Sequence, residues 1–195
     1  ADDLVAVHGD EVIGVEIVRR LLRAPALASL KGTLLAVPIV NAFGFMNHSR
    51  YLPDRRDLNR SFPGNSSGSL AARLANLFLR EIVLRSNVGI DLHSAAIHRT
   101  NLPQIRVVPG KPRTLALAEA FGAPLILMSA MREGSLRQIA AKQDIDVLLY
   151  EAGEGLRFDE HAVRTGGTGI LRVMRHPGMG SVKHITKPPA NAVRS

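Results

Sequence analysis

Two histidines and a glutamate stand at the ends of two apolar runs in this 195-residue sequence. His8 and Glu11 follow the run from Leu4 to Val7, and His93 follows the run from Asn87 to Leu92. Because a strand gives way to a helical pattern here, a spacing of three residues lets His8 and Glu11 converge on one point. Two imidazoles and a carboxylate suit Zn²⁺, and three protein ligands leave a fourth position open for water, as in catalytic zinc sites. The sequence therefore predicts one zinc ion per chain, held by His8, Glu11 and His93.

The predicted elements around these side chains alternate between strand and helix. Besides the two runs above, strands are predicted at 33–40, 104–108, 124–128 and 146–151, and amphipathic helices at 12–23, 70–82, 112–121, 135–142 and 159–175. The run 33–40 is continuously apolar, so we expect it to be a central strand. This alternation predicts an α/β fold with helices on both faces of a sheet.

Composition narrows the class of protein. The chain has no cysteine, so any metal must be held by His, Asp or Glu, and its 46% hydrophobic residues favour one folded domain. No apolar run approaches the ~20 residues that span a bilayer, and no signal-peptide pattern is present, so we expect a cytoplasmic protein without membrane contact. The formal charge is +8, but the basic residues are scattered and aromatic residues make up only 4%. We therefore expect small anionic substrates rather than nucleic acid as partners.

Four separated motifs support the metal site. The metal residues lie in His8-Gly9-Asp10-Glu11 and Asp91-Leu92-His93, a long polar loop contains the arginine-rich stretch from Arg50 to Gly64, and Tyr150-Glu151-Ala152-Gly153 follows. In this order they resemble the succinylglutamate desuccinylase/aspartoacylase family, zinc-dependent amidohydrolases related in fold to the zinc carboxypeptidases. The resemblance runs from about Leu4 to about Gly180.

The resemblance implies a three-layer αβα sandwich around a mixed, mostly parallel sheet. Relatives usually carry more strands before the first metal motif and a smaller β-rich domain after the last helix. We therefore expect residues 1–180 to form the catalytic domain, shortened at both ends unless the protein is a short variant. Residues 181–195 are expected to be a linker toward a β-rich domain that this sequence does not contain.

The resemblance also assigns roles to individual residues. Glu151 would be the general base, and Arg50 would polarise the scissile carbonyl. Asn59 and Arg60 would hold the carboxylate of the substrate, because a guanidinium grips a carboxylate at two points. Asp57 is expected to orient His8 or an arginine.

Some side chains in the second half of the chain have two readings. Glu154 is a competitor for the role of base, but it lies outside the Glu-x-Gly pattern of the family. Arg132 and Arg137 could line the pocket, although helix capping at Ser135 and a solvated helix face explain them equally well.

The leading hypothesis is a metal-dependent hydrolase that cleaves the amide of an N-acylated amino acid or a related small acylated amine. A metallocarboxypeptidase acting on peptides would use the same residues, and a catalytically silent binding domain of the same fold is a third reading. The ligand set also admits Co²⁺, Mn²⁺ or Ni²⁺, and a homo-oligomer is compatible with the sequence.

Overall fold

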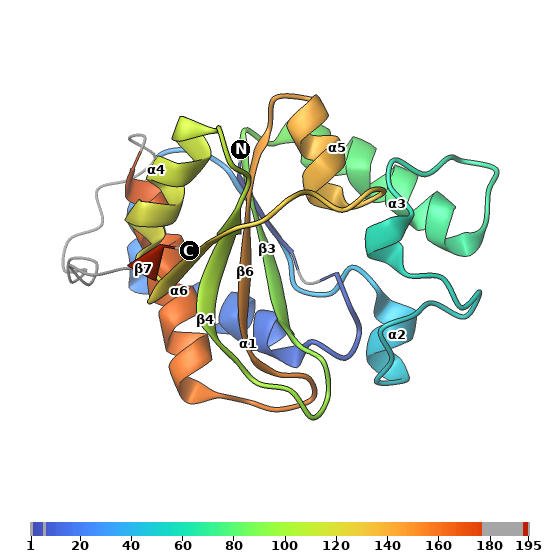
Figure 1. Ribbon diagram of the computed structural model, residues 1–195, viewed down its shortest axis with the longest axis horizontal. Coiled ribbons are helices and arrows are strands. Elements are labelled where there is room, and N and C mark those ends of the chain that lie inside the picture. The colour runs from blue at the N-terminus through green and yellow to red at the C-terminus, as the bar shows by residue number, and fades with distance from the viewer. Residues whose placement is uncertain (1, 6, 177–192, 195) are drawn as a thin grey trace.

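A mixed β-sheet forms the middle layer of the protein (Figure 1). The computed structural model describes residues 2–5, 7–176 and 193–194. Within these residues the strands are β1 (Asp2–Val5), β2 (Leu34–Val37), β3 (Val88–Ala95), β4 (Asn101–Val107), β5 (Leu125–Met128), β6 (Asp146–Glu154) and β7 (Val193–Arg194). Their order is β2-β1-β3-β6-β4-β5-β7, and every pairing is parallel except that of β4 with β6. The expected mixed, mostly parallel sheet is confirmed.

Helices cover both faces of this sheet, as Figure 1 shows. One layer contains α1 (Val12–Leu21), α4 (Pro112–Phe121) and α6 (Glu160–Arg175), and the other contains α3 (Leu70–Glu81) and α5 (Leu136–Lys142). Shorter helical segments are α2 (Ala42–Met46), η1 (Pro25–Ser29), η2 (Leu58–Arg60) and η3 (Val83–Arg85). Each layer packs on its own apolar cluster, so the predicted three-layer αβα sandwich is confirmed.

The alternation of side chains along the central strands decides where polar groups lie. On β3 and β6, Leu92, Leu148 and Tyr150 are fully buried in the cluster beneath α1, α4 and α6. Successive side chains of a strand point to opposite faces, so His93 and Glu151 face the side of α3 and α5. The polar face of the sheet is therefore turned toward the layer of α3 and α5, where a cavity can form.

The apolar run at 33–40 was predicted to be a central strand, and this is wrong. Its four-residue strand, β2, stands at the edge of the sheet and pairs only with β1 among the described residues. All four of its residues are half-buried. Its apolar side chains still have a packing role, because Leu34 and Ala36 pack against the core cluster beneath α1, α4 and α6, together with Leu27 of η1 and Leu30.

The expected linker at 181–195 falls mostly outside the described residues. Val193–Arg194 pair with β5 as the two-residue strand β7. Among the residues that the structure describes, no helix combines the length and the apolar character needed to cross a bilayer.

Candidate metal centre and active-site cavity

The first half of the metal centre is a short loop between β1 and α1. Glu11 is the N-cap residue of α1, yet its side chain makes no capping hydrogen bond and turns toward His8 instead. Gly9 lies against α2 so closely that a Cβ atom there would be 2.0 Å from the carbonyl carbon of Gly44. The backbone of α2 therefore packs directly on the loop and fixes the position of His8 and Glu11.

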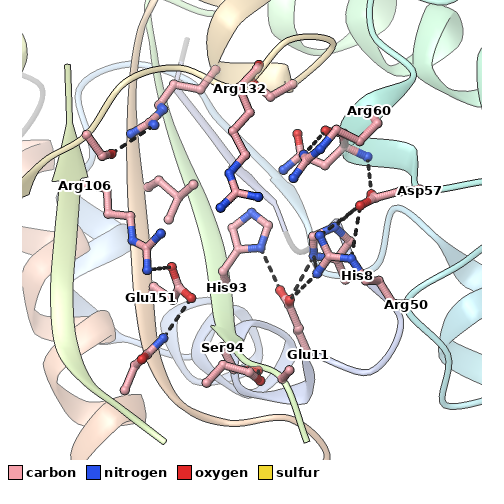
Figure 2. Close-up of a pocket in the computed structure, with 18 of the residues that line it drawn as sticks. His8, Glu11, Arg50, Asp57, Arg60, His93, Ser94, Arg106, Arg132 and Glu151 are labelled. Carbon is pink, nitrogen blue, oxygen red and sulfur yellow. Dashed lines mark hydrogen bonds and ion pairs between the residues drawn. The ribbon is translucent and has the colours of Figure 1, made fainter. Parts of the chain in front are cut away.

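The predicted ligands meet at one point of the molecule (Figure 2). Nδ1 of His8 is 2.8 Å from Oε1 of Glu11, and Nδ1 of His93 is 2.7 Å from Oε2 of the same carboxylate. One ligand atom from each of the three residues lies within 4.8 Å of the others. All three side chains are buried, so their convergence does not result from loosely held surface groups.

A second carboxylate stands behind each imidazole. Oδ1 of Asp57 is 3.2 Å from Nε2 of His8, and Oδ2 of Asp91 is 2.8 Å from Nε2 of His93. In both rings Nε2 faces a carboxylate while Nδ1 faces Glu11. Partners of this kind fix ring orientation and tautomer in metal sites. The expected orienting role of Asp57 therefore agrees with its position.

Glu11 and the two histidines shift one another's pKa values in opposite directions. Burial alone would raise the pKa of Glu11, but the positive charges of His8 and His93 hold that pKa well below its usual range. Burial would lower the pKa of His93, but the negative charges of Asp91 and Glu11 raise it well above the ordinary value. The pKa of His8 is raised against the same penalty by Glu11 and by its hydrogen bond with Asp57.

The geometry of these residues fits a divalent cation. Oε2 of Glu11 is buried and makes no hydrogen bond within the described part of the chain, although Nδ1 of His93 is close to it. A buried carboxylate oxygen without a hydrogen bond is costly unless a cation uses it. Two imidazole nitrogens and one such oxygen, each accessible to a common point, form a His₂Glu donor set of the kind that holds catalytic zinc.

A cavity of about 670 Å³ opens beside the three ligands. Among the described residues, its lining has three carboxylates, Glu11, Asp57 and Glu151, against six arginines, Arg50, Arg60, Arg99, Arg106, Arg132 and Arg137. Two of the carboxylates are already engaged with the histidines. The excess of guanidinium groups makes the cavity suitable for an anionic ligand.

Glu151 lies next to the candidate metal ligands because of the strand register. It is the cross-strand partner of His93 in the parallel pair of β3 and β6, and it lines the same cavity. Just beyond, the register shifts, so that Ala95 pairs with Glu154. Gly153 lies in this irregularity with a φ of 66°, a left-handed conformation that favours glycine. The left-handed backbone conformation therefore explains why the Tyr-Glu-Ala-Gly motif ends in glycine.

Replacing that glycine should destabilise the fold. In Gly153→Ala the new Cβ would sit at positive φ and 2.5 Å from Cδ1 of Ile13, so we expect the free energy of unfolding to fall by about 1–3 kcal/mol. Urea denaturation measures this change. Gly167→Ala in α6 is the matched control, because a Cβ there meets nothing within 4 Å. It should leave stability equal or higher by about 0.5–1 kcal/mol. Equal midpoints for the Gly153→Ala variant and the wild type would contradict the backbone argument.

Arg50 is located among the candidate metal ligands. Its Nη2 donates to Oδ2 of Asp57 at 2.9 Å, and its Nη1 is 3.6 Å from Oε1 of Glu11. The guanidinium is one-third exposed and lines the cavity. It is therefore within reach of a group bound at the ligands, as its predicted role requires.

Asn59 and Arg60 are neighbours in the cavity lining, and Arg60 lies across the cavity from Glu151 (Figure 2). Oδ1 of Asn59 accepts a hydrogen bond from the backbone N–H of Leu136 at 2.9 Å. Because that backbone group is a donor, the side-chain oxygen must face it, and the amide NH₂ of Asn59 is turned away. Arg60 donates to the carbonyl of Asn59 and lies at the cavity edge. Burial and the nearby Arg132 and Arg50 lower the pKa of its guanidinium, opposed only by Asp57.

The structure decides whether Arg132 and Arg137 line the cavity or belong to a solvated helix face. Ser135 caps α5 by accepting from the N–H of Gln138, as one reading expected. Arg137 nevertheless lines the cavity as a buried residue, and its Nη1 makes no hydrogen bond within the described residues. Arg132 extends into the cavity toward His93 (Figure 2). Both arginines therefore belong to the site.

Sequence reasoning did not identify three contributors to the site. Asp91 lies two residues before His93 on β3, so the period of a strand already placed it on the same face. Arg106 and Asn101 come from β4, and both contact Glu151. No local motif marks them, because the pairing of β4 with β6 is what brings them to the site.

The sandwich fold and the His₂Glu cluster define an α/β protein with a candidate metal centre at one end of its central strands. The catalytic-domain model of the succinylglutamate desuccinylase/aspartoacylase family matches residues 4–177. The chain belongs to this family, whose members include deacylases of N-acyl amino acids.

Three relatives illustrate the likeness. The N-alpha-acetyl-L-2,4-diaminobutyric acid deacetylase of Halomonas elongata is 33% identical over 127 residues, which are 62% of this chain and 37% of that protein. A succinylglutamate desuccinylase/aspartoacylase structure from Rhodobacter sphaeroides is 29% identical with a TM-score of 0.86. The product-bound ectoine utilization protein EutE (DoeB) from Ruegeria pomeroyi has a TM-score of 0.88 at 24% identity. The alignments with these two structures cover 99% of this chain and 61% of each of theirs.

Proposed function

We propose that this chain is the catalytic part of a zinc-dependent amidohydrolase that cleaves the amide bond of an N-acylated amino acid. The observation that carries the proposal is the convergence of His8, Glu11 and His93 within 4.8 Å at the wall of an arginine-lined cavity. The similarity to a deacetylase named for an N-acetylated amino acid supports the substrate class.

His8, Glu11 and His93 would hold the metal, which when bound supplies a Lewis acid for the amide carbonyl and lowers the pKa of a water toward neutrality. Glu151 would accept the proton of the attacking water and deliver it to the leaving nitrogen. Arg50, close to the ligands, would stabilise the negative charge that develops on the carbonyl oxygen.

The opposite wall would bind the amino-acid end of the substrate. The NH₂ group of Asn59 is free to point toward a ligand because its oxygen is held by Leu136. Arg60 adds a guanidinium at the same wall, so that an α-carboxylate would meet a charge-assisted pair of donors. This arrangement favours substrates with a free carboxylate next to the scissile amide.

A matched substrate panel tests the proposal. The protein, after incubation with zinc, is given N-acetyl and N-succinyl amino acids, N-alpha-acetyl-L-2,4-diaminobutyric acid, the α-carboxamide of each, and short peptides, and release of free amine is measured. We expect turnover of acyl amino acids and a loss of about 10- to 100-fold in kcat/KM for the carboxamides, since a charged hydrogen bond contributes about 1.5–3 kcal/mol.

Two outcomes would contradict this function. Cleavage of peptides without cleavage of acyl amino acids would assign the site to a metallocarboxypeptidase. Stoichiometric zinc binding without turnover of either class would identify a binding domain that keeps the fold.

A further inference from the structure

The carboxylate of Glu151 is held at both oxygens by a neighbouring strand. Nδ2 of Asn101 donates to Oε1 at 2.8 Å, and Nη2 of Arg106 is 2.8 Å from Oε2 (Figure 2). Both partners come from β4, and all three residues line the cavity. A carboxylate held at two points by a guanidinium and an amide has one orientation, unlike one that is free to rotate about its last bond.

An irregularity of the sheet makes this arrangement possible. In the antiparallel pair of β4 and β6, Gln104 is the partner of Glu151, and Asn101 is the partner of Gly153. Three steps along β4 therefore match two steps along β6, which is the count of a β-bulge. In an unbroken strand, residues three apart face opposite sides. The extra residue is what places the side chain of Asn101 on the same face as Glu151.

Arg106 reaches the carboxylate by ordinary register. It lies two residues after Gln104, and so on the same face, and its partner in β6 is Leu149, two residues before Glu151. Its contact with Glu151 is thus a diagonal pair across the ladder. The Nε atom of Arg106 is buried without a hydrogen bond among the described residues, so Glu151 is the partner that fixes the guanidinium.

We propose that Asn101 and Arg106 are positioning residues that set the direction in which Glu151 presents its carboxylate to the cavity. This proposal rests on the proposed function, in which Glu151 is the base. A carboxylate has about four lone-pair sites, so two donors leave others available to a water at the metal ligands. The two donors would act through Glu151 and not on the substrate.

The kinetic test uses three variants of the zinc-loaded protein. Arg106→Met and Asn101→Ala are expected to lower kcat by about 10- to 100-fold, the size of effect that follows from displacing a catalytic group by about 1 Å. KM and zinc content should change little, because both residues contact Glu151 and neither belongs to the His₂Glu set or to the pair Asn59 and Arg60. Arg106→Lys should recover part of kcat, since its ammonium can still donate to Oε2 but without a planar fork.

Arg157→Met is the matched control. Arg157 is an exposed arginine whose Nε lies 3.2 Å from Oε2 of Glu154, the other glutamate at this end of β6, and it does not line the cavity. A loss of kcat in Arg157→Met as large as in Arg106→Met would show that the loss of any arginine paired with a glutamate of β6 lowers turnover, and it would overturn the proposal.

A crystal structure of the Asn101→Ala/Arg106→Met double variant, compared with the wild type, separates this proposal from the proposed function. We expect the Glu151 carboxylate to leave its wild-type orientation while the fold and the metal ligands stay in place. An unchanged orientation of this carboxylate would overturn the proposal that Asn101 and Arg106 position Glu151, whatever the activity of the variant. Failure of the wild type to hydrolyse any acyl amino acid would count against the proposed function alone, because the crystallographic comparison does not depend on turnover.

Discussion

A His93→Ala variant is expected to lose its bound metal and all measurable hydrolysis. Removal of one of three buried ligands leaves His8 and Glu11 alone, and two ligands do not complete a zinc site. The carboxylate of Glu11 would also lose the imidazole that lies 2.7 Å from its Oε2. Mass spectrometry of metals should give about one zinc per chain for the wild type and close to none for the variant.

The exposed His161 offers a matched control for this experiment, because it lies at the start of α6 away from the cavity lining. His161→Ala should keep both its zinc and its activity. Far-UV circular dichroism should show that His93→Ala remains folded. Retention of stoichiometric zinc by His93→Ala, or a wild type that takes up no metal after incubation with zinc, would contradict the site.

The convergence of His8, Glu11 and His93 could be predicted because each of them depends on local information. His8 and Glu11 are three residues apart at a strand-to-helix junction, and His93 follows a recognisable strand. In a mostly parallel sheet the carboxyl ends of neighbouring strands lie at the same edge, so the two motifs had to meet. β1 and β3 are indeed adjacent.

The contacts of Glu151 could not be predicted in the same way. They depend on β4 lying beside β6 in the antiparallel direction, and on where the register shifts. A shift of one residue moves a side chain to the other face of a sheet, and nothing local in the sequence around Asn101 fixes that shift. The misplaced strand β2 has a similar cause, since an apolar run does not reveal whether its partner lies on one side or on both.

Glu151→Gln should lower kcat by about 10²- to 10⁴-fold, the range that general acid–base catalysis contributes. Glutamine has nearly the same shape as glutamate but cannot accept the proton of a water. Residue 151 lies beside His93 but is not a member of the His₂Glu set. Zinc content should therefore equal that of the wild type, which distinguishes this variant from His93→Ala. Steady-state release of free amine from an N-acyl amino acid measures the loss.

Glu154→Gln tests whether this effect belongs to one carboxylate. Glu154 lies three residues further along β6, but the register shift pairs it with Ala95, and its oxygens contact the N–H of His98 at 2.9 Å and Arg157 at 3.2 Å. It thus stabilises the turn beyond the strand and does not line the cavity. We expect its kcat to stay within about threefold of the wild type, as for a substitution without a part in proton transfer. A large loss in Glu154→Gln together with an active Glu151→Gln would transfer the role of base to Glu154. The two substitutions remove the same charge from one strand, so the difference between them isolates the position beside His93 as the cause.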